Sequence, residues 1–93
     1  MKKVSVIVPV YNAAEFLAET LDTILNQTLE DIEVIAVNDG SADNSWEILE
    51  DYAARDIRMH IIDQKNGGPS AARNNGLNNA EGATVFFFDS ADL

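Results

Sequence analysis

Residues 3–9 read KVSVIVP, a stretch in which Val and Ile predominate. Nearly continuous apolar character predicts a strand that is buried on both faces, as in a parallel sheet between two layers of helices. Three later segments have the same character, namely residues 33–37, 59–62 and 83–88. The chain therefore predicts four buried strands, the first of which ends at Pro9.

Apolar residues at helical spacing separate these strands. Residues 13–26 form the first predicted helix, and Asn12 with Glu15 three positions later matches a capping box at its start. The second predicted helix follows the second strand, with Asp43 or Ser45 as its cap. Both helices are amphipathic, so each is expected to pack one side against the sheet.

The third predicted helix begins at Pro69, because proline lacks the N–H that a first helical position leaves unpaired. In it Ala72, Gly76 and Ala80 recur every four residues, which predicts a small-residue face that approaches a sheet closely. The complete order is β-α-β-α-β-α-β. This order predicts an α/β fold, a Rossmann-like parallel sheet with right-handed crossovers and helices on both faces.

The composition of the chain excludes several classes of function. The 93 residues are 46% hydrophobic and carry a formal net charge of −10, which suits one domain or part of one and excludes a nucleic-acid binder that neutralises phosphates. The chain has no cysteine and one histidine, so disulfides, thiolate chemistry and a histidine metal cluster are excluded. No apolar run is long enough to span a bilayer. A cytoplasmic location, at the inner face of the membrane in the intact protein, is expected.

Polar segments follow all four predicted strands, at residues 9–12, 38–41, 63–69 and 89–93. Because the carboxyl ends of parallel strands share one edge of the sheet, these segments are expected to form one polar crevice in which a ligand binds. The first segment lacks a Gly-x-Gly-x-x-Gly pattern, and the chain lacks a P-loop lysine motif. A standard dinucleotide fold and a P-loop NTPase are therefore excluded.

Each candidate residue in this crevice, taken alone, also has a purely structural explanation. Asp39 precedes a glycine and could bond its own turn. Arg73 could be a solvated helix residue, and Tyr11 could serve plain packing. Asp89 and Asp92 could cap a following helix. A functional interpretation therefore depends on the combination of segments.

Together, the four segments resemble the family 2 glycosyltransferases of the GT-A fold. The matching stretches are residues 8–12 (VPVYN), 37–45 (VNDGSADNS), 66–76 (NGGPSAARNNG) and 89–92 (DSAD), in the family's order and near its spacing. The resemblance implies an enzyme that transfers a sugar from a nucleotide-diphosphate donor, usually UDP-linked, to an acceptor hydroxyl with inversion. The acceptor would be a saccharide, a lipid-linked compound or another hydroxyl compound.

The resemblance also implies roles for individual residues. The carboxylate that matches Asp39 reads the ring N–H of uracil, and a carboxylate is a pure acceptor that suits this donor. Pro9 and Tyr11 match the segment that lines the nucleotide base. Arg73 matches an arginine near the base and the phosphates, a role that suits a guanidinium.

A metal ion is part of the same expectation. An acidic protein that binds a diphosphate needs a cation between the charges, so Mg²⁺ or Mn²⁺ is expected. Asp92, with Asp89, matches the metal motif of the family. The usual motif has a carboxylate at the third position, where this chain has Ala91. We therefore expect the metal site to be weak without nucleotide.

The resemblance covers only the nucleotide-binding half of the family's domain. Residues 1–93 are therefore expected to be the N-terminal nucleotide-binding part of a larger glycosyltransferase domain, truncated at its C-terminal end. The catalytic base is expected beyond Leu93, so the chain on its own is expected to be inactive in transfer. Apolar surface that the remainder of the domain would cover is expected to be exposed.

Two other functions stay open. A non-catalytic α/β module that holds a nucleotide or a partner protein would have the same fold, and Ala91 favours it. A nucleotidyltransferase would share the sheet, but that class begins with a Gly-rich loop carrying Arg or Lys after the first strand. Residues 10–14 (VYNAA) have neither feature.

Overall fold

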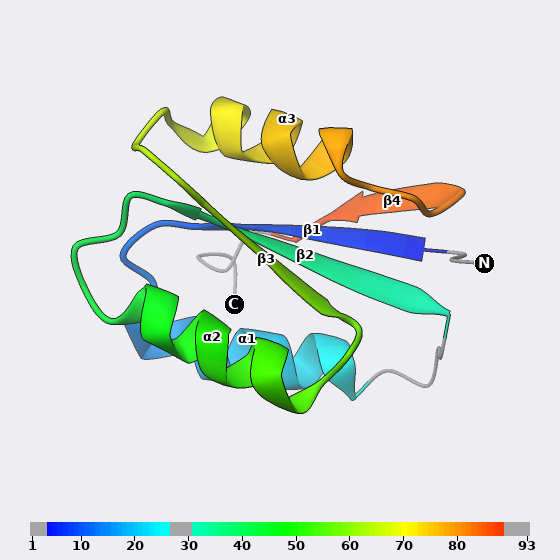
Figure 1. Cartoon of the computed structure of the whole chain (residues 1–93), viewed down its shortest axis with the longest axis horizontal. Helices are drawn as coiled ribbons and strands as arrows, with labels where there is room; N and C mark the ends of the chain where they lie inside the picture. The colour runs from blue at the N-terminus through cyan, green and yellow to red at the C-terminus, as the bar shows by residue number, and fades with distance from the viewer. Residues whose placement is uncertain (1–3, 27–30, 89–93) are drawn as a thin grey trace.

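The computed structural model describes residues 4–26 and 31–88 (Figure 1). Strands and helices alternate along it in the order β1 (Val4–Val10), α1 (Ala14–Leu25), β2 (Ile32–Asp39), α2 (Ser45–Arg55), β3 (Met59–Gln64), α3 (Pro69–Asn78) and β4 (Thr84–Phe87). Every element predicted from the sequence is present, and the bounds differ from the predicted ones only at the ends.

All the strands are parallel, and their order in the sheet is β3-β2-β1-β4. The KVSVIVP stretch supplies β1, which lies between β2 and β4. In this position Ile7 is paired with Ile35 on one side and with Phe87 on the other. The parallel α/β fold predicted from the sequence is therefore confirmed, and the carboxyl ends of the strands lie along one edge.

Helices cover both faces of the sheet, with α1 and α2 on one face and α3 on the other (Figure 1). The larger core cluster lies under α1 and α2 and includes Val8, Leu17, Leu21, Val34 and Leu49. The smaller cluster lies under α3 and consists of Ile35, Val37 and Ala72. Because β2 is covered on both faces, every one of its residues is buried.

Helix α3 packs closely against the sheet. Ala72 and Gly76 are buried on its inner face, as the four-residue spacing predicted, whereas Ala80 lies beyond the helix, which ends at Asn78. A Cβ atom added at Gly76 would lie 2.5 Å from the Cγ2 atom of Ile7, which is closer than carbon atoms pack in a protein interior. The glycine therefore sets how near α3, and the side chains that it carries, come to β1.

The capping box predicted at the start of α1 from Asn12 and Glu15 is wrong. The N-cap is Ala13, without a side-chain cap hydrogen bond. Asn12 has a left-handed backbone with φ of 48°, which asparagine tolerates better than most residues. Its Oδ1 atom accepts a hydrogen bond from the N–H of Ala42 at 2.7 Å. The side chain thus joins two loops instead of capping its own helix.

Apolar surface is exposed at the edge strand β4, as the sequence led us to expect. Phe86 and Phe87 are 56% and 51% exposed. With Val4 and Val6 they line an open apolar groove. Among the helices of the described part of the chain, none has the length and apolar character needed to cross a membrane.

Candidate functional site

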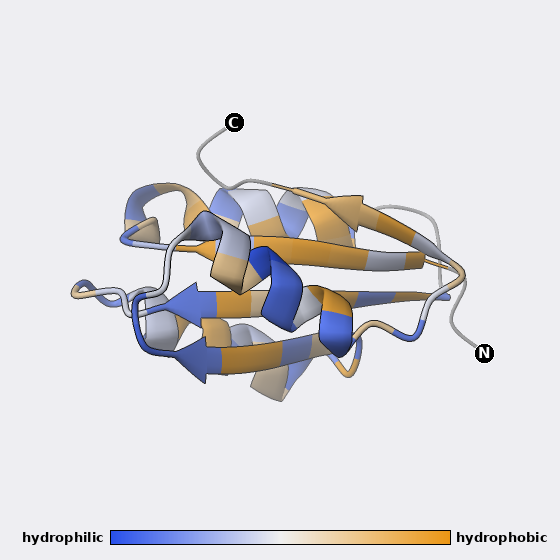
Figure 2. Cartoon of the chain, turned by 90° about the horizontal axis from the view of Figure 1, so that it is seen from above, coloured by the Kyte–Doolittle hydropathy of each residue, from blue (hydrophilic) through white to orange (hydrophobic). Residues whose placement is uncertain are grey.

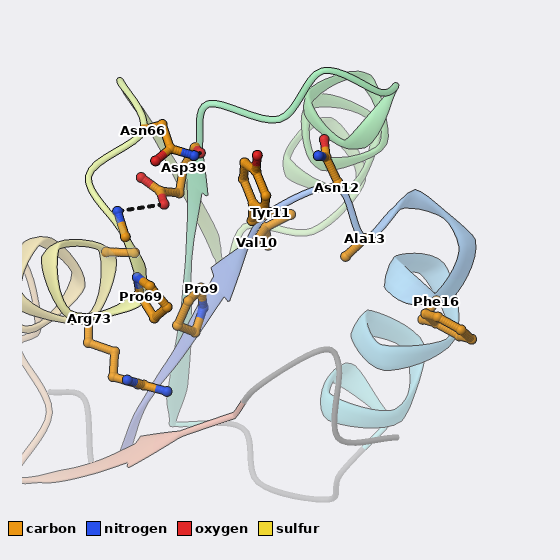
Figure 3. Close-up of a pocket in the computed structure, with 12 residues that line it drawn as sticks. Pro9, Val10, Tyr11, Asn12, Ala13, Phe16, Asp39, Asn66, Pro69 and Arg73 are labelled. Carbon is orange, nitrogen blue, oxygen red and sulfur yellow. Dashed lines mark hydrogen bonds between the residues drawn. The ribbon is translucent and has the colours of Figure 1, made fainter.

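Hydrophilic residues gather where β2 and β3 end (Figure 2). At this edge a hollow of about 490 Å³ opens between the end of β1, the end of β2 and the start of α3 (Figure 3). The residues predicted to bind a nucleotide, Pro9, Tyr11, Asp39 and Arg73, all line it. Side chains from three separate parts of the sequence therefore meet in one pocket.

Asp39 is the last residue of β2 and is 3% exposed. Its Oδ1 atom accepts hydrogen bonds from Nε2 of Gln64 at 2.9 Å and from the N–H of Gly67 at 2.8 Å, and its Oδ2 atom accepts one from the N–H of Gly68 at 3.0 Å. Burial raises the pKa of Asp39, but these three hydrogen bonds outweigh burial and leave the pKa below its ordinary value of 3.8. Asp39 is therefore an ionised acceptor at neutral pH.

The partners of Asp39 show that it bonds the β3–α3 loop rather than its own turn. The turn after Asp39 depends on Gly40, whose φ is 71°. A Cβ atom at Gly40 would lie 2.8 Å from the backbone nitrogen of Asn66. The loops after β2 and β3 are thus in contact, and the Asp39 carboxylate joins them.

Tyr11 and Pro9 form another side of the hollow. Tyr11 is 55% exposed, and Figure 3 shows its ring beside Asp39, with Pro9 near the start of α3. An exposed aromatic ring next to a buried hydrogen-bond acceptor offers both surfaces that a planar heterocycle needs. This part of the hollow suits a nucleotide base.

Arg73 lies one turn into α3, which begins at Pro69 as predicted. Its side chain extends from the helix on the same side of the hollow as Pro9, below it in the view of Figure 3. Within residues 4–26 and 31–88, Arg73 forms no ion pair, whereas Arg55 and Arg58 pair with nearby aspartates. A partly buried guanidinium near a helix N-terminus favours a negatively charged group.

The loop between β2 and α2 fixes the start of both neighbouring helices. Asp43 accepts hydrogen bonds from the N–H of Ala14 at 3.1 Å and from the N–H and the hydroxyl of Ser45 at 3.0 and 2.6 Å. The Ser45 hydroxyl oxygen accepts one from the N–H of Ala13 at 3.2 Å. Burial raises the pKa of Asp43, but the bonds from Ser45 and Ala14 outweigh it and lower the pKa. The prediction of Asp43 or Ser45 as the cap of α2 needs correction, because Asn44 is the N-cap.

The residues predicted to hold a metal, Asp89 and Asp92, lie outside the described residues. Within the described ranges, no group of three or more His, Asp or Glu side chains is placed to hold a metal ion. The described chain ends at Phe88, whose N–H donates to the carbonyl oxygen of Ile7 at 2.8 Å. Phe88 directly follows β4, the strand next to the one that carries Pro9.

Sequence reasoning missed the side chains that hold Asp39. Gln64 is the last residue of β3, and its Oε1 atom accepts a hydrogen bond from Nδ2 of Asn75 in α3 at 2.8 Å. Neither residue belongs to a local pattern with Asp39, because the contacts join three separate elements. The only available signal was a polar residue at the end of an apolar strand.

The fold and the hollow define an α/β protein with a nucleotide-sized pocket at the carboxyl edge of a parallel sheet. The sequence profile described as Glycosyl transferase family 2 matches residues 5–93. The chain therefore belongs to the family 2 glycosyltransferases, as the resemblance in its motifs implied.

Individual relatives agree with this assignment. EpsJ, an uncharacterized glycosyltransferase of Bacillus subtilis (strain 168), is 54% identical over 89 residues, which cover 96% of this chain and 26% of EpsJ. Among solved structures, S. aureus TarS 1–349 in complex with UDP-GlcNAc has a TM-score of 0.87 and 37% identity, over 95% of this chain and 26% of that chain.

A second solved structure has a different nucleotide. The mannosyltransferase PcManGT from Pyrobaculum calidifontis, in complex with GDP-Man and Mn²⁺, has a TM-score of 0.88 and 29% identity, over 95% of this chain and 27% of that chain. The chain thus spans about a quarter of the length of these relatives. The fold is that of the GT-A glycosyltransferases.

Proposed function

We propose that this chain binds the donor, a uridine-diphosphate sugar, for an enzyme that transfers the sugar to an acceptor hydroxyl with inversion. The observation that supports this most is the ionised, buried carboxylate of Asp39 in a hollow that Tyr11 and Arg73 also line. Family membership establishes sugar transfer as the activity of the class. In this proposal residues 1–93 are the N-terminal donor-binding part of the domain.

The base of the donor fits the side of the hollow formed by Asp39, Tyr11 and Pro9. The uracil ring of UDP has one N–H that donates, and a carboxylate only accepts. A carboxylate offers roughly four acceptor positions, of which described residues occupy three at Asp39. The Tyr11 ring would contact the flat face of the base, as aromatic rings do with planar ligands. The complex of TarS with UDP-GlcNAc supports the choice of uridine.

The diphosphate fits the side of the hollow formed by Arg73 and the N-terminus of α3. The guanidinium can donate two parallel hydrogen bonds to phosphate oxygens. The first backbone N–H groups of a helix also favour an anion. One arginine leaves most of the charge uncompensated in a chain of net charge −10.

We propose that Mg²⁺ or Mn²⁺ neutralises part of this excess of negative charge. Asp92, with Asp89, would hold the ion, because carboxylate oxygens are the protein ligands that these hard cations favour. When bound, the ion would neutralise charge on the departing diphosphate. The Mn²⁺ in the PcManGT complex supports this proposal.

Calorimetric titration of the full chain with UDP tests the proposed function. We expect Asp39→Ala to weaken UDP binding by about 1–3 kcal/mol, or roughly 5- to 150-fold, because a charge-assisted hydrogen bond to the base is lost. The same variant should also unfold more easily, since the carboxylate holds the β3–α3 loop.

Glu47→Ala is the matched control for charge. Glu47 is exposed and lines a different hollow near the same edge of the sheet. Its removal changes the net charge by the same amount and should leave UDP affinity within about twofold, since exposed charges are screened. Equal UDP affinity in wild type and Asp39→Ala would contradict the proposed function.

A further inference from the structure

A chain of hydrogen bonds connects Asp39 with helix α3 through two amide side chains. Nε2 of Gln64 donates to Oδ1 of Asp39 at 2.9 Å, and Nδ2 of Asn75 donates to Oε1 of Gln64 at 2.8 Å. Both amide residues are partly buried. The chain joins the ends of β2 and β3 to α3, the helix that also carries Arg73.

The direction of these hydrogen bonds is set at both ends, because Asp39 only accepts and Oδ1 of Asn75 accepts a hydrogen bond from Nδ2 of Asn79 at 3.3 Å. A side-chain amide has an oxygen that accepts and an NH₂ group that donates. Because Asn75 donates to the oxygen of Gln64, the NH₂ group of Gln64 faces Asp39, where an ionised carboxylate can only accept. The opposite orientation of the Gln64 amide would place its oxygen against the carboxylate oxygen.

This arrangement distributes the acceptor positions of Asp39 unequally. Within the described chain Oδ1 accepts two hydrogen bonds and Oδ2 accepts one. The position that remains for a ligand is therefore on Oδ2, which is bonded to Gly68 at the hollow (Figure 3). Rotation of the carboxylate would give up the Gln64 bond and would turn this position away from its present direction.

We propose that Asn75 and Gln64 are positioning residues, which hold the Asp39 carboxylate at the rotation in which Oδ2 presents its open position to the ring N–H of the base. This inference rests on the proposed function, in which Asp39 accepts that N–H. Neither residue needs to touch the nucleotide. Their contribution is to base recognition rather than to the phosphates.

Two ligands that differ only at the ring nitrogen isolate this contribution. UDP has the N–H that Asp39 would accept, whereas N3-methyl-UDP lacks it and places a methyl group there. The ratio of their affinities reports how well Asp39 is positioned. A general loosening of the pocket weakens both ligands alike and leaves the ratio unchanged. For the wild type, we expect UDP to bind about tenfold or more tightly than the methylated form.

Asn75→Asp reverses the direction of the hydrogen bonds at almost constant shape. An ionised aspartate at this position only accepts, so the Gln64 amide must turn its NH₂ group toward it and its oxygen toward Asp39. We expect the ratio of the UDP affinity to the N3-methyl-UDP affinity to fall to about one- to threefold. The reason is that the Gln64 oxygen would repel the Asp39 carboxylate from its position. Asn75→Ala removes the donor to Gln64 without reversing the hydrogen bonds. The ratio of affinities in this variant should lie between that of the wild type and that of Asn75→Asp.

Asn78→Asp is the control, because it adds the same charge at an exposed position of α3. Its ratio should equal that of the wild type. If both Asn75 variants had the same ratio of affinities as the wild type, the positioning role would be overturned and the proposed function would stay intact. A wild type that binds both ligands equally would overturn the role of Asp39 at the N–H and this inference with it.

Failure of the wild type to bind UDP at all would contradict the proposed function itself, and therefore also this inference. If Asn75→Asp does not fold, Asn75→Ala and Gln64→Ala provide the same comparison. Both keep the charge of the chain, and each should lower the ratio relative to the wild type. Unchanged ratios in these two variants would overturn the inference.

Discussion

At the scale of single residues, two aspartates of one short segment have different roles. Asp39 is buried and lines the hollow with Tyr11 and Arg73. Asp43 lies on the other side of the β2 end and bonds the starts of α1 and α2. Both carboxylates have lowered pKa values, because hydrogen-bond donors outweigh burial at each. Only their positions in the fold distinguish the two carboxylates, since Asp39 lines the hollow and Asp43 does not.

Asp43→Ala should destabilise the fold without removing a nucleotide contact. The change leaves the N–H groups of Ala14 and Ser45 without their acceptor, and loss of a side-chain acceptor for N–H groups at a helix start costs about 0.5–2 kcal/mol. The free energy of unfolding from urea denaturation measures this loss. Asp51→Ala is the comparison, because Asp51 pairs with Arg55 at the surface, where an ion pair is worth about 0–1 kcal/mol. Equal stability of the two variants would show that Asp43 does not hold the helix starts.

The sequence placed Pro9, Tyr11, Asp39 and Arg73 correctly at one hollow, because strand ends of a parallel sheet must share an edge. It could not supply the partners of Asp39. Those partners come from the end of β3 and the loop after it, 25 or more positions away in the sequence. Patterns among neighbouring residues carry no information about such contacts. The failed capping box at Asn12 has the same cause, since the acceptors at the start of α1 come from Asp43 and from Ser45 at the start of α2.

At the scale of elements, the closeness of α3 to the sheet determines where Arg73 and Asn75 lie. Ala72 and Gly76 form the contact surface of this helix. The spacing of these small residues in the sequence predicted the close approach of α3 to the sheet. The strands were equally predictable, because β2 is buried on both faces and is apolar from Val34 to Val37, directly before its polar end.

Gly76→Ala should destabilise the protein despite the better helix propensity of alanine. The added Cβ would meet Cγ2 of Ile7 at 2.5 Å, and overpacking of this kind costs about 1–3 kcal/mol. Alanine recovers about 1 kcal/mol relative to glycine in a helix, so the net loss is expected to be about 0–2 kcal/mol.

Asn78→Ala in the same helix is the control for propensity. Asn78 is exposed, so the substitution should be neutral or stabilising by about 0.5 kcal/mol. Thermal or urea unfolding measures both variants. A Gly76→Ala protein that is at least as stable as the wild type would mean that α3 can move away from β1 at no cost.

At the scale of the whole molecule, the lowered pKa values of Asp39, Asp43 and Asp56 predict sensitivity to acid. Hydrogen bonds from Gln64 and Gly67 at Asp39, and from Arg58 at Asp56, favour the charged carboxylates in the fold. A lowered pKa in the folded state gives stability that is present above the unfolded value of about 3.8 and is lost as the pH falls through the folded value.

The free energy of unfolding should therefore be greatest above about pH 5 and should decline below about pH 4. Asp43→Asn cannot take up this proton, so its stability should depend less steeply on pH in the same range. Urea denaturation at a series of pH values measures both proteins. If the free energy of unfolding depended on pH in the same way in the wild type and in Asp43→Asn, Asp43 would not contribute to the acid sensitivity.

The central claim is that the hollow at the carboxyl edge of the sheet binds a nucleoside diphosphate. Backbone amide resonances of the full chain, followed by NMR during titration with UDP, test this claim most directly. We predict that the largest shifts arise at Tyr11, Asp39, Gly68 and Arg73, with little change at Gly82 on the opposite edge. Shifts confined to the apolar groove at Phe86 and Phe87, or no shifts at saturating UDP, would contradict it.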